Sequence, residues 1–454
     1  MVEVKRGKMA NGGNIEMVDG REIAELKLEQ RYKYLGIQQT YEIRQKENTE
    51  DTKNELMKRV RKILKTQLSA RNIIEALNTW AIPSFLYTAG VLTWTKTELQ
   101  QIDRRIRTTL TEYGMHHPNS AIERLYLPRK QGGRGLTNME QACLKEKQNL
   151  STYFRNTHLP VQQWIMTHGD RNIITPEDSA EEPVIQNHIE RLEQSWQAKA
   201  LHGRFHASLS QQEVDQAGSH TYLTQGYLYP QSEATFLAIQ DQVVPTRTYS
   251  KYVMKLPVET TKCRLCNDAE ESVQHISSAC STIAGTKYLA RHDNMGKVVH
   301  QLLCLQYGLL QSLTPHHLYS PQPIVENDSF KVYWDITIST DIAVEHNRPD
   351  VVVWNKINRT VVIVDFTVPM DGNLKKSYDE KKKKYEALSR QMRDMWRLNK
   401  VEVMPLIISC NGLVHEFTTK HLRQLKLPPN AITWMQKAVI LGTINIIRQV
   451  VYPH

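Results

Sequence analysis

Cysteine is scarce in this chain, which has six cysteines among 454 residues. So few cysteines exclude the disulfide framework of a small secreted protein. Long apolar stretches are also missing: no run of about eighteen apolar residues occurs. The N-terminal segment Met1-Val-Glu-Val-Lys-Arg-Gly-Lys8 is too charged for a secretory signal. These absences predict an intracellular protein that neither spans a membrane nor is secreted.

The acidic residues of a polymerase active site are missing as well. No Tyr-x-Asp-Asp box occurs in the sequence, and no upstream carboxylates accompany one. A polymerase needs those acids because they hold the two metal ions of phosphoryl transfer. We therefore expect that this chain does not copy nucleic acid.

Positive charge, by contrast, is in excess. The formal net charge is +10 and the isoelectric point is near 9.1, a balance that favours a polyanionic partner. With 454 residues, the chain is long enough for roughly two to four domains.

Two short β-branched runs near residue 350 predict an antiparallel hairpin. They are Val351–Trp354 and Val361–Val364, and the residues between them favour a turn. In such a pair, the start of the first strand lies beside the end of the second. Asp350 and Asp365 should therefore converge, and converging carboxylates suit a hard cation such as Mg²⁺ or Mn²⁺.

A lysine-rich segment follows the hairpin. We expect one helix from about Leu374 to Trp396, then a strand from Val401 to Ser409 that is buried on both faces. Lys381 and Lys384 are three residues apart and would share one helix face. From that face an ammonium group would reach oxygens bound to the metal.

A compact cluster of metal-ligand residues precedes the hairpin in the sequence. Cys263, Cys266, His275 and Cys280 form a C-x2-C-x8-H-x4-C pattern, which is typical of a closed tetrahedral Zn²⁺ site. A closed site leaves no position for water, so this zinc should be structural. The other three cysteines lie in apolar contexts and are expected to be buried free thiols. They are Cys143, Cys304 and Cys410.

The order hairpin, helix and strand, with Pro-Asp, a second acid and lysine, resembles the restriction-endonuclease-like nucleases of the PD-(D/E)xK type. Three motifs are more closely similar to the C-terminal endonuclease of site-specific non-long-terminal-repeat retrotransposons. They are Asn347-Arg-Pro-Asp350, Val364-Asp-Phe-Thr-Val-Pro369 and Lys381-x-x-Lys384-Tyr385. One departure is Thr367, which stands where the general nuclease pattern has its lysine.

The resemblance implies a catalytic site of Asp350, Asp365, Lys381, Lys384 and Tyr385. The two aspartates would hold Mg²⁺ or Mn²⁺, with the carbonyl of Phe366 as a further ligand. Either Lys381 or Lys384 would replace the missing lysine, because the retrotransposon branch supplies it from the following helix. Tyr385 would orient that lysine or contact phosphate.

The N-terminal region carries a second resemblance to the same elements. Arg31-Tyr-Lys-Tyr-Leu-Gly-Ile37 reads as a strand ending at a glycine turn, and it is similar to a segment that follows the catalytic motifs of reverse transcriptases. The basic helical region from Thr49 to about His116 looks like the thumb of a retroelement polymerase. Charged helix faces of this kind are also common as merely solvated surfaces.

Several cations are candidate contacts for nucleic-acid phosphates. Leu127–Leu136 is a glycine-rich basic loop, although a loop that simply enters a helix needs no ligand. A helix over Arg247–Lys255 would place Arg247, Lys251 and Lys255 along one face. The predicted nucleic-acid-binding residues are Arg129, Lys130, Arg134, Arg247, Lys251 and Arg348.

These observations predict an α+β multidomain protein in which the N-terminal two-thirds is mostly helical. We expect a palm-end and thumb-like region over residues 1–156 and a linker with a helical connector over 157–255. A zinc knuckle with a helical segment would occupy 256–325, and an α/β restriction-endonuclease-like domain 326–454.

The expected function is metal-dependent nicking of target DNA by a retrotransposon polyprotein fragment, or by the product of a gene derived from one. The resemblance implies a DNA target, element RNA as a second partner, and a nuclear location. An alternative from another class is a nucleic-acid-binding zinc protein whose nuclease fold has lost turnover. Metal-dependent cleavage distinguishes the two, since binding needs the charges but no Mg²⁺.

Overall fold

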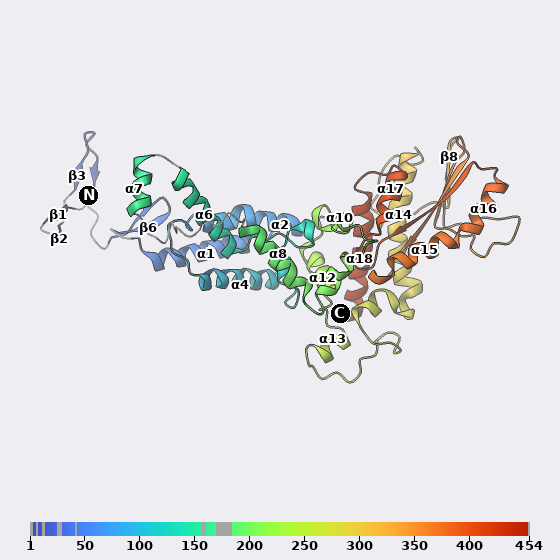
Figure 1. Cartoon of the computed structure of the whole chain (residues 1–454), viewed down its shortest axis with the longest axis horizontal. Coiled ribbons are helices and arrows are strands. Elements are labelled where there is room, and N and C mark those ends of the chain that lie inside the picture. The colour runs from blue at the N-terminus through green and yellow to red at the C-terminus, as the bar shows by residue number, and fades with distance from the viewer. Residues whose placement is uncertain are drawn as a thin grey trace. The chain divides into compact units, whose positions relative to one another are not determined.

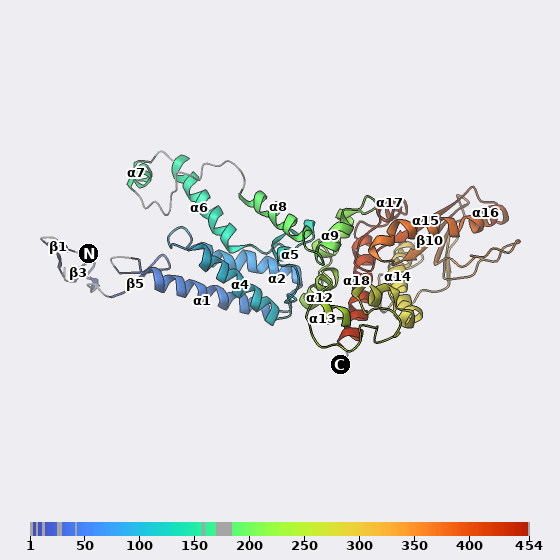
Figure 2. The ribbon, with the colours of Figure 1, turned by 60° about the horizontal axis from the view of Figure 1, so that its bottom comes forward.

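The computed structural model describes residues 3–5, 8–10, 14–24, 30–40, 43–156, 159–168 and 184–452. These residues form two compact units (Figures 1 and 2). The first consists of Met1–Thr66, Glu75–Thr109 and Thr137–His188, and the second of Gln67–Ile74, Leu110–Leu136 and Ile189–His454. The fold is mixed α/β, with many helices and a five-stranded sheet in the C-terminal part. Residues 157, 158 and 169–183 of the linker and helical connector predicted over 157–255 lie outside the described residues.

The first unit begins with short hairpins and continues as helices. Tyr32–Tyr34 pairs with Ile37–Gln39 across a turn in which Leu35 and Gly36 have φ of 47° and 85°, so the predicted strand and glycine turn are confirmed. Its elements, with α2 and the end of α4 shared with the second unit, are β1 (Glu3–Lys5), β2 (Lys8–Ala10), β3 (Ile15–Glu16), β4 (Glu22–Ile23), β5 (Tyr32–Tyr34), β6 (Ile37–Gln39), α1 (Gln45–Leu64), α2 (Ala70–Ala76), η1 (Leu77–Ala81), α3 (Ile82–Leu86), α4 (Lys96–Glu112), α6 (Met139–Asn156) and α7 (Pro160–His168).

Helix α1 shows how the sequence pattern creates the core of this unit. Leu56, Val60 and Ile63 recur at helical spacing and are buried, whereas Lys58 and Lys62 remain exposed. The basic face predicted for this helix is therefore on its surface.

The second unit is built around a sheet with the strand order β11-β10-β9-β8-β7. β10 and β11 are parallel, and the other neighbours are antiparallel. Val351 pairs with Val364, so the predicted hairpin is confirmed in its register. The strands are β7 (Ile324–Glu326), β8 (Phe330–Trp334), β9 (Val351–Asn355), β10 (Thr360–Thr367) and β11 (Lys400–Ile407).

Helices cover both faces of the sheet because its strands carry apolar residues on both sides. Residues of α14 (Leu289–Gln306), α17 (Glu416–Gln424) and α18 (Ala431–Val451) share a core with Val364 and Phe366. The opposite face packs Val361 and Ile363 against residues from Tyr385 to Leu398. The views agree that α14 and α18 lie side by side (Figures 1 and 2), and α18 packs chiefly on α14 rather than directly on the sheet.

The single helix predicted from Leu374 to Trp396 is wrong in one respect. It is divided into α15 (Leu374–Lys384) and α16 (Glu386–Met395) at Tyr385, whose φ and ψ of −102° and 11° are not helical. The side chain of Tyr385 is completely buried at this break. At this interruption, the side chain of Tyr385 points into the core between the lysine-rich helix and the sheet.

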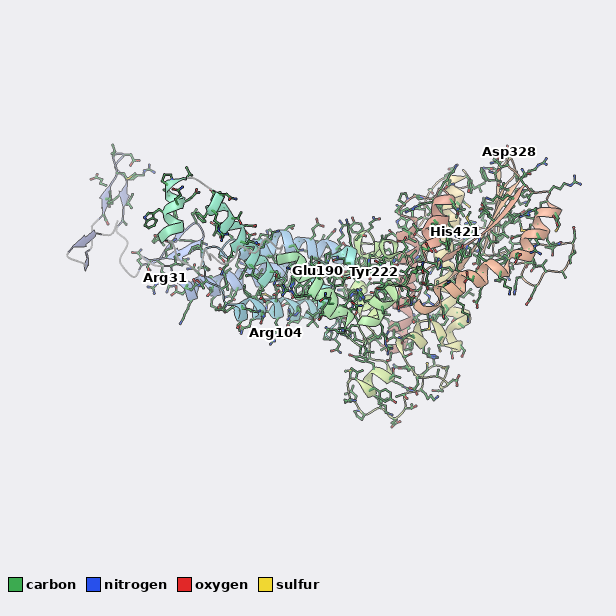
Figure 3. The ribbon with its side chains drawn as sticks, viewed as in Figure 1. Arg31, Arg104, Glu190, Tyr222, Asp328 and His421 are labelled. Atoms are coloured by element: carbon green, nitrogen blue, oxygen red, sulfur yellow. The ribbon has the colours of Figure 1, made fainter. Side chains whose placement is uncertain are left out.

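Short helices complete the second unit, and a buried ion cluster joins several of them. Glu233 accepts hydrogen bonds from Arg129 at 2.9 Å and from Arg134 at 2.7 Å, and Arg124 pairs with Asp241 at 3.0 Å. Tyr222, labelled in Figure 3, is buried nearby and packs edge-on against Phe236. The helices are α5 (Glu123–Tyr126), η2 (Arg129–Gln131), α8 (Val184–Gln197, begun in the first unit), α9 (Gly203–Leu209), α10 (Gln216–Ser219), α11 (Thr221–Thr224), α12 (Pro230–Gln240), α13 (Arg247–Tyr252), η3 (His275–Ala279), η4 (Ser281–Ile283), η5 (Ala284–Tyr288) and η6 (Asp371–Asn373).

Replacing Glu233→Gln should destabilise the second unit strongly. The substitution leaves the fully buried Arg134 guanidinium without its counter-charge, and breaking a buried pair in this way costs about 3–5 kcal/mol. Urea unfolding measures the change. Glu386→Gln is the matched control, because its i,i+4 pair with Arg390 is exposed and such pairs contribute little. Equal shifts for the two variants would contradict the importance of the buried cluster.

Candidate functional site

The predicted cysteine and histidine ligands come together in the second unit. One ligand atom from each of Cys263, Cys266, His275 and Cys280 lies within 4.8 Å of all the others. The Sγ atoms of Cys263 and Cys280 are 4.0 Å apart, close to the separation of about 3.8 Å that a tetrahedron with 2.3 Å Zn–S bonds requires. This cluster can hold a zinc ion.

Local backbone geometry favours the thiolate form of one ligand. Backbone N–H groups of Asp268 and Ala269, together with the His275 side chain, lower the pKa of Cys266 to about 6. Cys263 and Cys280 are completely buried, and burial raises the pKa of Cys263. Metal binding needs deprotonated cysteines, so the partly buried Cys266 is more readily available as a ligand than Cys263.

The cluster is packed onto the C-terminal part of α18. Cys263 and Cys280 share a hydrophobic core with Ile440, Ile444 and Ile447. Arg264 pairs with the buried Glu271 at 2.8 Å and also donates to a carbonyl of α18. Residues 263–280, which we call the zinc segment, are therefore fixed to the same helix that closes the core of the sheet. The three other cysteines are buried free thiols, as expected: Cys143, Cys304 and Cys410.

Asp350 and Asp365 form a second candidate site at one edge of the β9–β10 hairpin. Asp350 directly precedes β9, and its Oδ2 accepts a hydrogen bond from the backbone N–H of Phe366 at 2.7 Å. The Asp350 side chain is 20% exposed, whereas that of Asp365 is 1% exposed. The hairpin register brings the two carboxylates together, with Asp350 toward solvent and Asp365 behind it.

The lysine-rich helix meets Asp365 at this edge. Lys381 forms an ion pair with Asp365 Oδ2, and the Tyr385 hydroxyl donates to Asp365 Oδ1 at 2.5 Å. Lys384 donates to the Tyr385 hydroxyl at 2.8 Å and lies over its ring. Lys381 therefore contacts an acid directly, while Lys384 reaches the pair only through Tyr385.

His292 of α14 is a member of this cluster that sequence reasoning missed. Its Nε2 lies 3.2 Å from Asp350 Oδ2 and 3.1 Å from the Phe366 carbonyl oxygen. Its Nδ1 lies 3.1 Å from Asp293 Oδ1. A lone His-Asp pair in a helix gives no signal of this role, because the contact spans some seventy residues of sequence.

The surroundings of the two aspartates shift their pKa values in opposite directions. Burial raises the pKa of Asp365, and the charge of Asp350 raises it further. For Asp350, burial acts in the same direction, but the hydrogen bond and charge of His292 leave its pKa below the ordinary value. Burial opposes protonation of His292, yet Asp293 and Asp350 raise its pKa to about 10. An added cation would favour ionised Asp365.

The glycine-rich basic loop does not present all of its cations. Arg134 is 1% exposed and Arg129 is partly buried, and both guanidinium groups lie on Glu233. Their role in this structure is internal charge balance, which argues against the predicted phosphate contacts of these two residues. Lys130, by contrast, is exposed.

The other predicted nucleic-acid contacts are at the surface in varying degree. Helix α13 ends before Lys255, whose φ is 56°, so the predicted single face with Arg247 and Lys251 is wrong. Lys251 is exposed, while Arg247 is half-buried and donates to a backbone carbonyl of the zinc segment. Arg348 is exposed and forms an ion pair with Asp335 at 2.8 Å.

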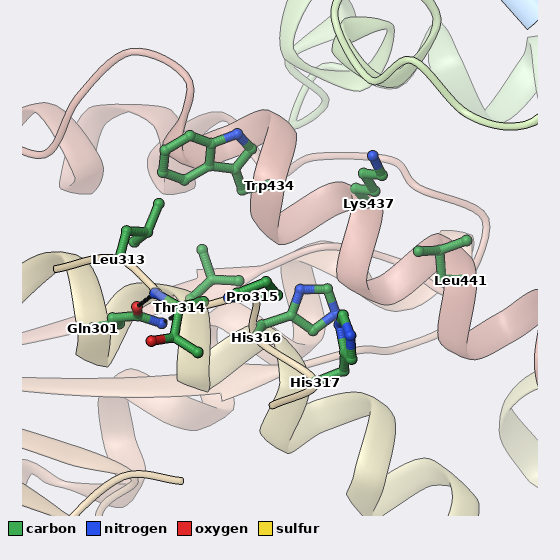
Figure 4. A pocket seen from close by; sticks show the side chains of 10 residues that line it. Gln301, Leu313, Thr314, Pro315, His316, His317, Trp434, Lys437 and Leu441 are labelled. Carbon is green, nitrogen blue, oxygen red and sulfur yellow. Dashed lines mark hydrogen bonds between the residues drawn. The ribbon is translucent and has the colours of Figure 1, made fainter. Parts of the chain in front are cut away.

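A pocket of about 450 Å³ lies apart from both candidate sites, between α14 and α18 (Figure 4). Trp434 and Leu441 provide apolar walls, and His316, His317 and Lys437 also line the pocket. None of the described residues that line it is acidic. No residue predicted from the sequence to be functional contributes to this pocket.

No model of a known protein family matches the chain, and no curated protein matches it either. Within the described part of the chain, no helix has both the length and the apolar character needed to cross a membrane.

The metal cluster leads to a direct test by metal analysis. Purified protein should contain about one zinc per chain, and Cys280→Ser should lose most of it because a tetrahedral structural site needs all four ligands. Inductively coupled plasma mass spectrometry measures the content, and Cys143→Ser, another buried free cysteine, is the control. Full zinc content in Cys280→Ser would rule out this ligand set.

Proposed function

We propose that this chain is a metal-dependent endonuclease that nicks DNA at Asp350 and Asp365, as part of a retrotransposon polyprotein or of a gene derived from one. The observation that supports the proposal best is the convergence of these aspartates with Lys381 and Tyr385 at one sheet edge. Two acids that hold a metal ion, together with a nearby lysine and access from solvent, can support hydrolysis of a phosphodiester.

The available donors fit Mg²⁺ or Mn²⁺. Asp350 Oδ2, Asp365 Oδ2 and the Phe366 carbonyl are hard oxygen donors, the class that these cations select. Asp365 is buried beside Asp350, and the negative charge of Asp350 helps to raise the pKa of Asp365. A bound cation would relieve the repulsion between the two carboxylates. When bound, the ion would lower the pKa of a water nucleophile and stabilise charge on the phosphate.

The protein groups around the acids have separate roles in this proposal. Lys381 stabilises the negative charge that develops on the phosphate, since its ammonium already lies at Asp365. Tyr385 fixes the Asp365 carboxylate by its hydrogen bond, and Lys384 orients Tyr385. This arrangement favours Lys381 over Lys384 as the lysine that replaces the one missing at Thr367.

The zinc cluster and the exposed cations would hold the DNA. In this proposal the knuckle is structural and places a small module beside the nuclease, and Lys130, Lys251 and Arg348 offer exposed charges for phosphates. Element RNA as a second partner and a nuclear location follow from the family resemblance alone.

A second function has its own supporting observation. Lys381 pairs with Asp365 and His292 pairs with Asp350, so protein cations already accompany both acids. A nuclease fold that has lost turnover could keep such pairs as structural contacts. That chain would be a nucleic-acid-binding zinc protein, and only metal-dependent cleavage separates it from the nuclease.

Supercoiled plasmid tests the nuclease directly. With Mg²⁺ the protein should convert it to the nicked form, and EDTA should stop the reaction. Asp350→Asn and Asp365→Asn should each lower the rate on the order of 10³-fold, because each removes a charged oxygen from the metal site.

The control for charge is Asp328→Asn. Asp328 is exposed in the turn before β8 (Figure 3), and the register of β8 and β9 puts it at the opposite end of these strands from Asp350. Its rate should match the parent. Tight, salt-sensitive DNA binding by the parent without any nicking would establish the binding protein instead.

The two lysines should differ in their effects. Lys381→Met should reduce nicking on the order of 10²-fold, since it removes the cation at the acids. Lys384→Met should cost less than about tenfold, because its ammonium contacts only Tyr385 and the loss is that of one hydrogen bond. Single-turnover rates at saturating protein measure both. The reverse order would identify Lys384 as the catalytic lysine.

A further inference from the structure

His292 makes contacts that either an N–H donor or a shared cation would explain. Its Nε2 lies 3.2 Å from Asp350 Oδ2 and 3.1 Å from the Phe366 carbonyl oxygen. Both oxygens are acceptors only, so the nitrogen can approach them as an N–H donor or together with a shared cation. Neighbouring ligands of an octahedral ion with bonds of about 2.1 Å are about 3.0 Å apart. The observed separations match that spacing.

The other ring nitrogen has the partner that metal-binding histidines usually have. Nδ1 of His292 lies 3.1 Å from Oδ1 of Asp293. A carboxylate at this position keeps a proton on Nδ1, so Nε2 is the nitrogen that would lose its proton to coordinate a metal. His292 thus lies between the Asp293 carboxylate on one side and Asp350 on the other, as a histidine does when a second carboxylate orients it toward a metal.

The helix that carries His292 is held close to the sheet. A Cβ atom at Gly296 would lie 2.8 Å from Trp334 and 2.9 Å from Phe366, so only glycine permits this approach. On the opposite side, the buried Arg291 donates to the Ser277 carbonyl at 2.7 Å and to Thr443 at 3.0 Å. His292 is therefore presented to the hairpin by a rigid element, as a metal ligand must be.

We propose that His292 is a nitrogen ligand of the metal in the nuclease centre, beside Asp350 and the Phe366 carbonyl, and that Asp293 orients it. This inference rests on the proposed nuclease function but assigns a ligand that no sequence motif indicated. An imidazole among oxygen ligands shifts preference from Mg²⁺ toward first-row transition metals. The site should therefore bind Mn²⁺ more tightly than Mg²⁺.

Mn²⁺ binding to the zinc-loaded full chain tests the assignment without reference to catalysis. Titration followed by electron paramagnetic resonance gives the affinity, and spin-echo modulation detects a ¹⁴N nucleus bonded to Mn²⁺. The parent should show a nitrogen-coupled ion. His292→Ala should lose that signal and bind Mn²⁺ more than about tenfold more weakly, and Asp293→Asn should weaken binding about 10- to 100-fold.

Two further variants sharpen the result. His292→Glu replaces nitrogen by oxygen, so it should bind Mn²⁺ without ¹⁴N modulation and should compete more effectively for Mg²⁺ than His292→Ala does. His317→Ala is the matched control, since this exposed histidine lies in the pocket between α14 and α18. Both affinity and nitrogen signal should be unchanged in it.

The possible outcomes separate this inference from the proposed function. Unchanged Mn²⁺ affinity in His292→Ala, or a parent ion without nitrogen coupling, overturns the ligand assignment even if plasmid nicking depends on Asp350. Nitrogen-coupled Mn²⁺ that requires His292, in a protein that never nicks DNA, supports the ligand and refutes the nuclease. No Mn²⁺ binding by the parent overturns the ligand assignment, and the plasmid assay then decides the function separately.

Discussion

The close packing of α14 between the sheet and α18 is the contact on which the second unit depends. Its apolar residues Met295, Val299 and Leu303 are completely buried and join the two elements in one core. Gly296 allows the helix to lie against Phe366. The side chain of Arg291 points toward the zinc segment, and that of His292 points toward Asp350. One helix therefore sets the positions of both candidate sites.

Much of the candidate site was predictable because its determinants are local. Hairpin register follows from two β-branched runs and a short turn, and it alone brings Asp350 to Asp365. The four candidate zinc ligands lie within eighteen residues, so their spacing carries the information. His292 and the break at Tyr385 depend on tertiary packing, and neither periodicity nor propensity encodes that. The wrong helix face at Lys255 came from extending a periodic pattern past the end of a six-residue helix.

The basic loop shows a limit of reasoning from charge. Net charge counts every cation equally, but a guanidinium paired with a buried carboxylate is part of the interior and offers nothing to a phosphate. Arg124, Arg129 and Arg134 all belong to this group, and their partners are about one hundred residues away in sequence. Sequence spacing cannot reveal such pairing. The exposed cations of α1 and Lys130 are among those that do contribute to the electrostatic surface.

The position of α14 in the chain limits how the protein can be divided. This helix precedes the first strand of the sheet and begins only nine residues after the last cysteine of the zinc cluster. A fragment starting at the strands would expose the valine and phenylalanine side chains that α14 covers, while one that stops before α18 would open the zinc segment. The metal cluster and the sheet thus form one structural unit. Recombination or protein engineering must transfer residues from about Cys263 to Val451 together.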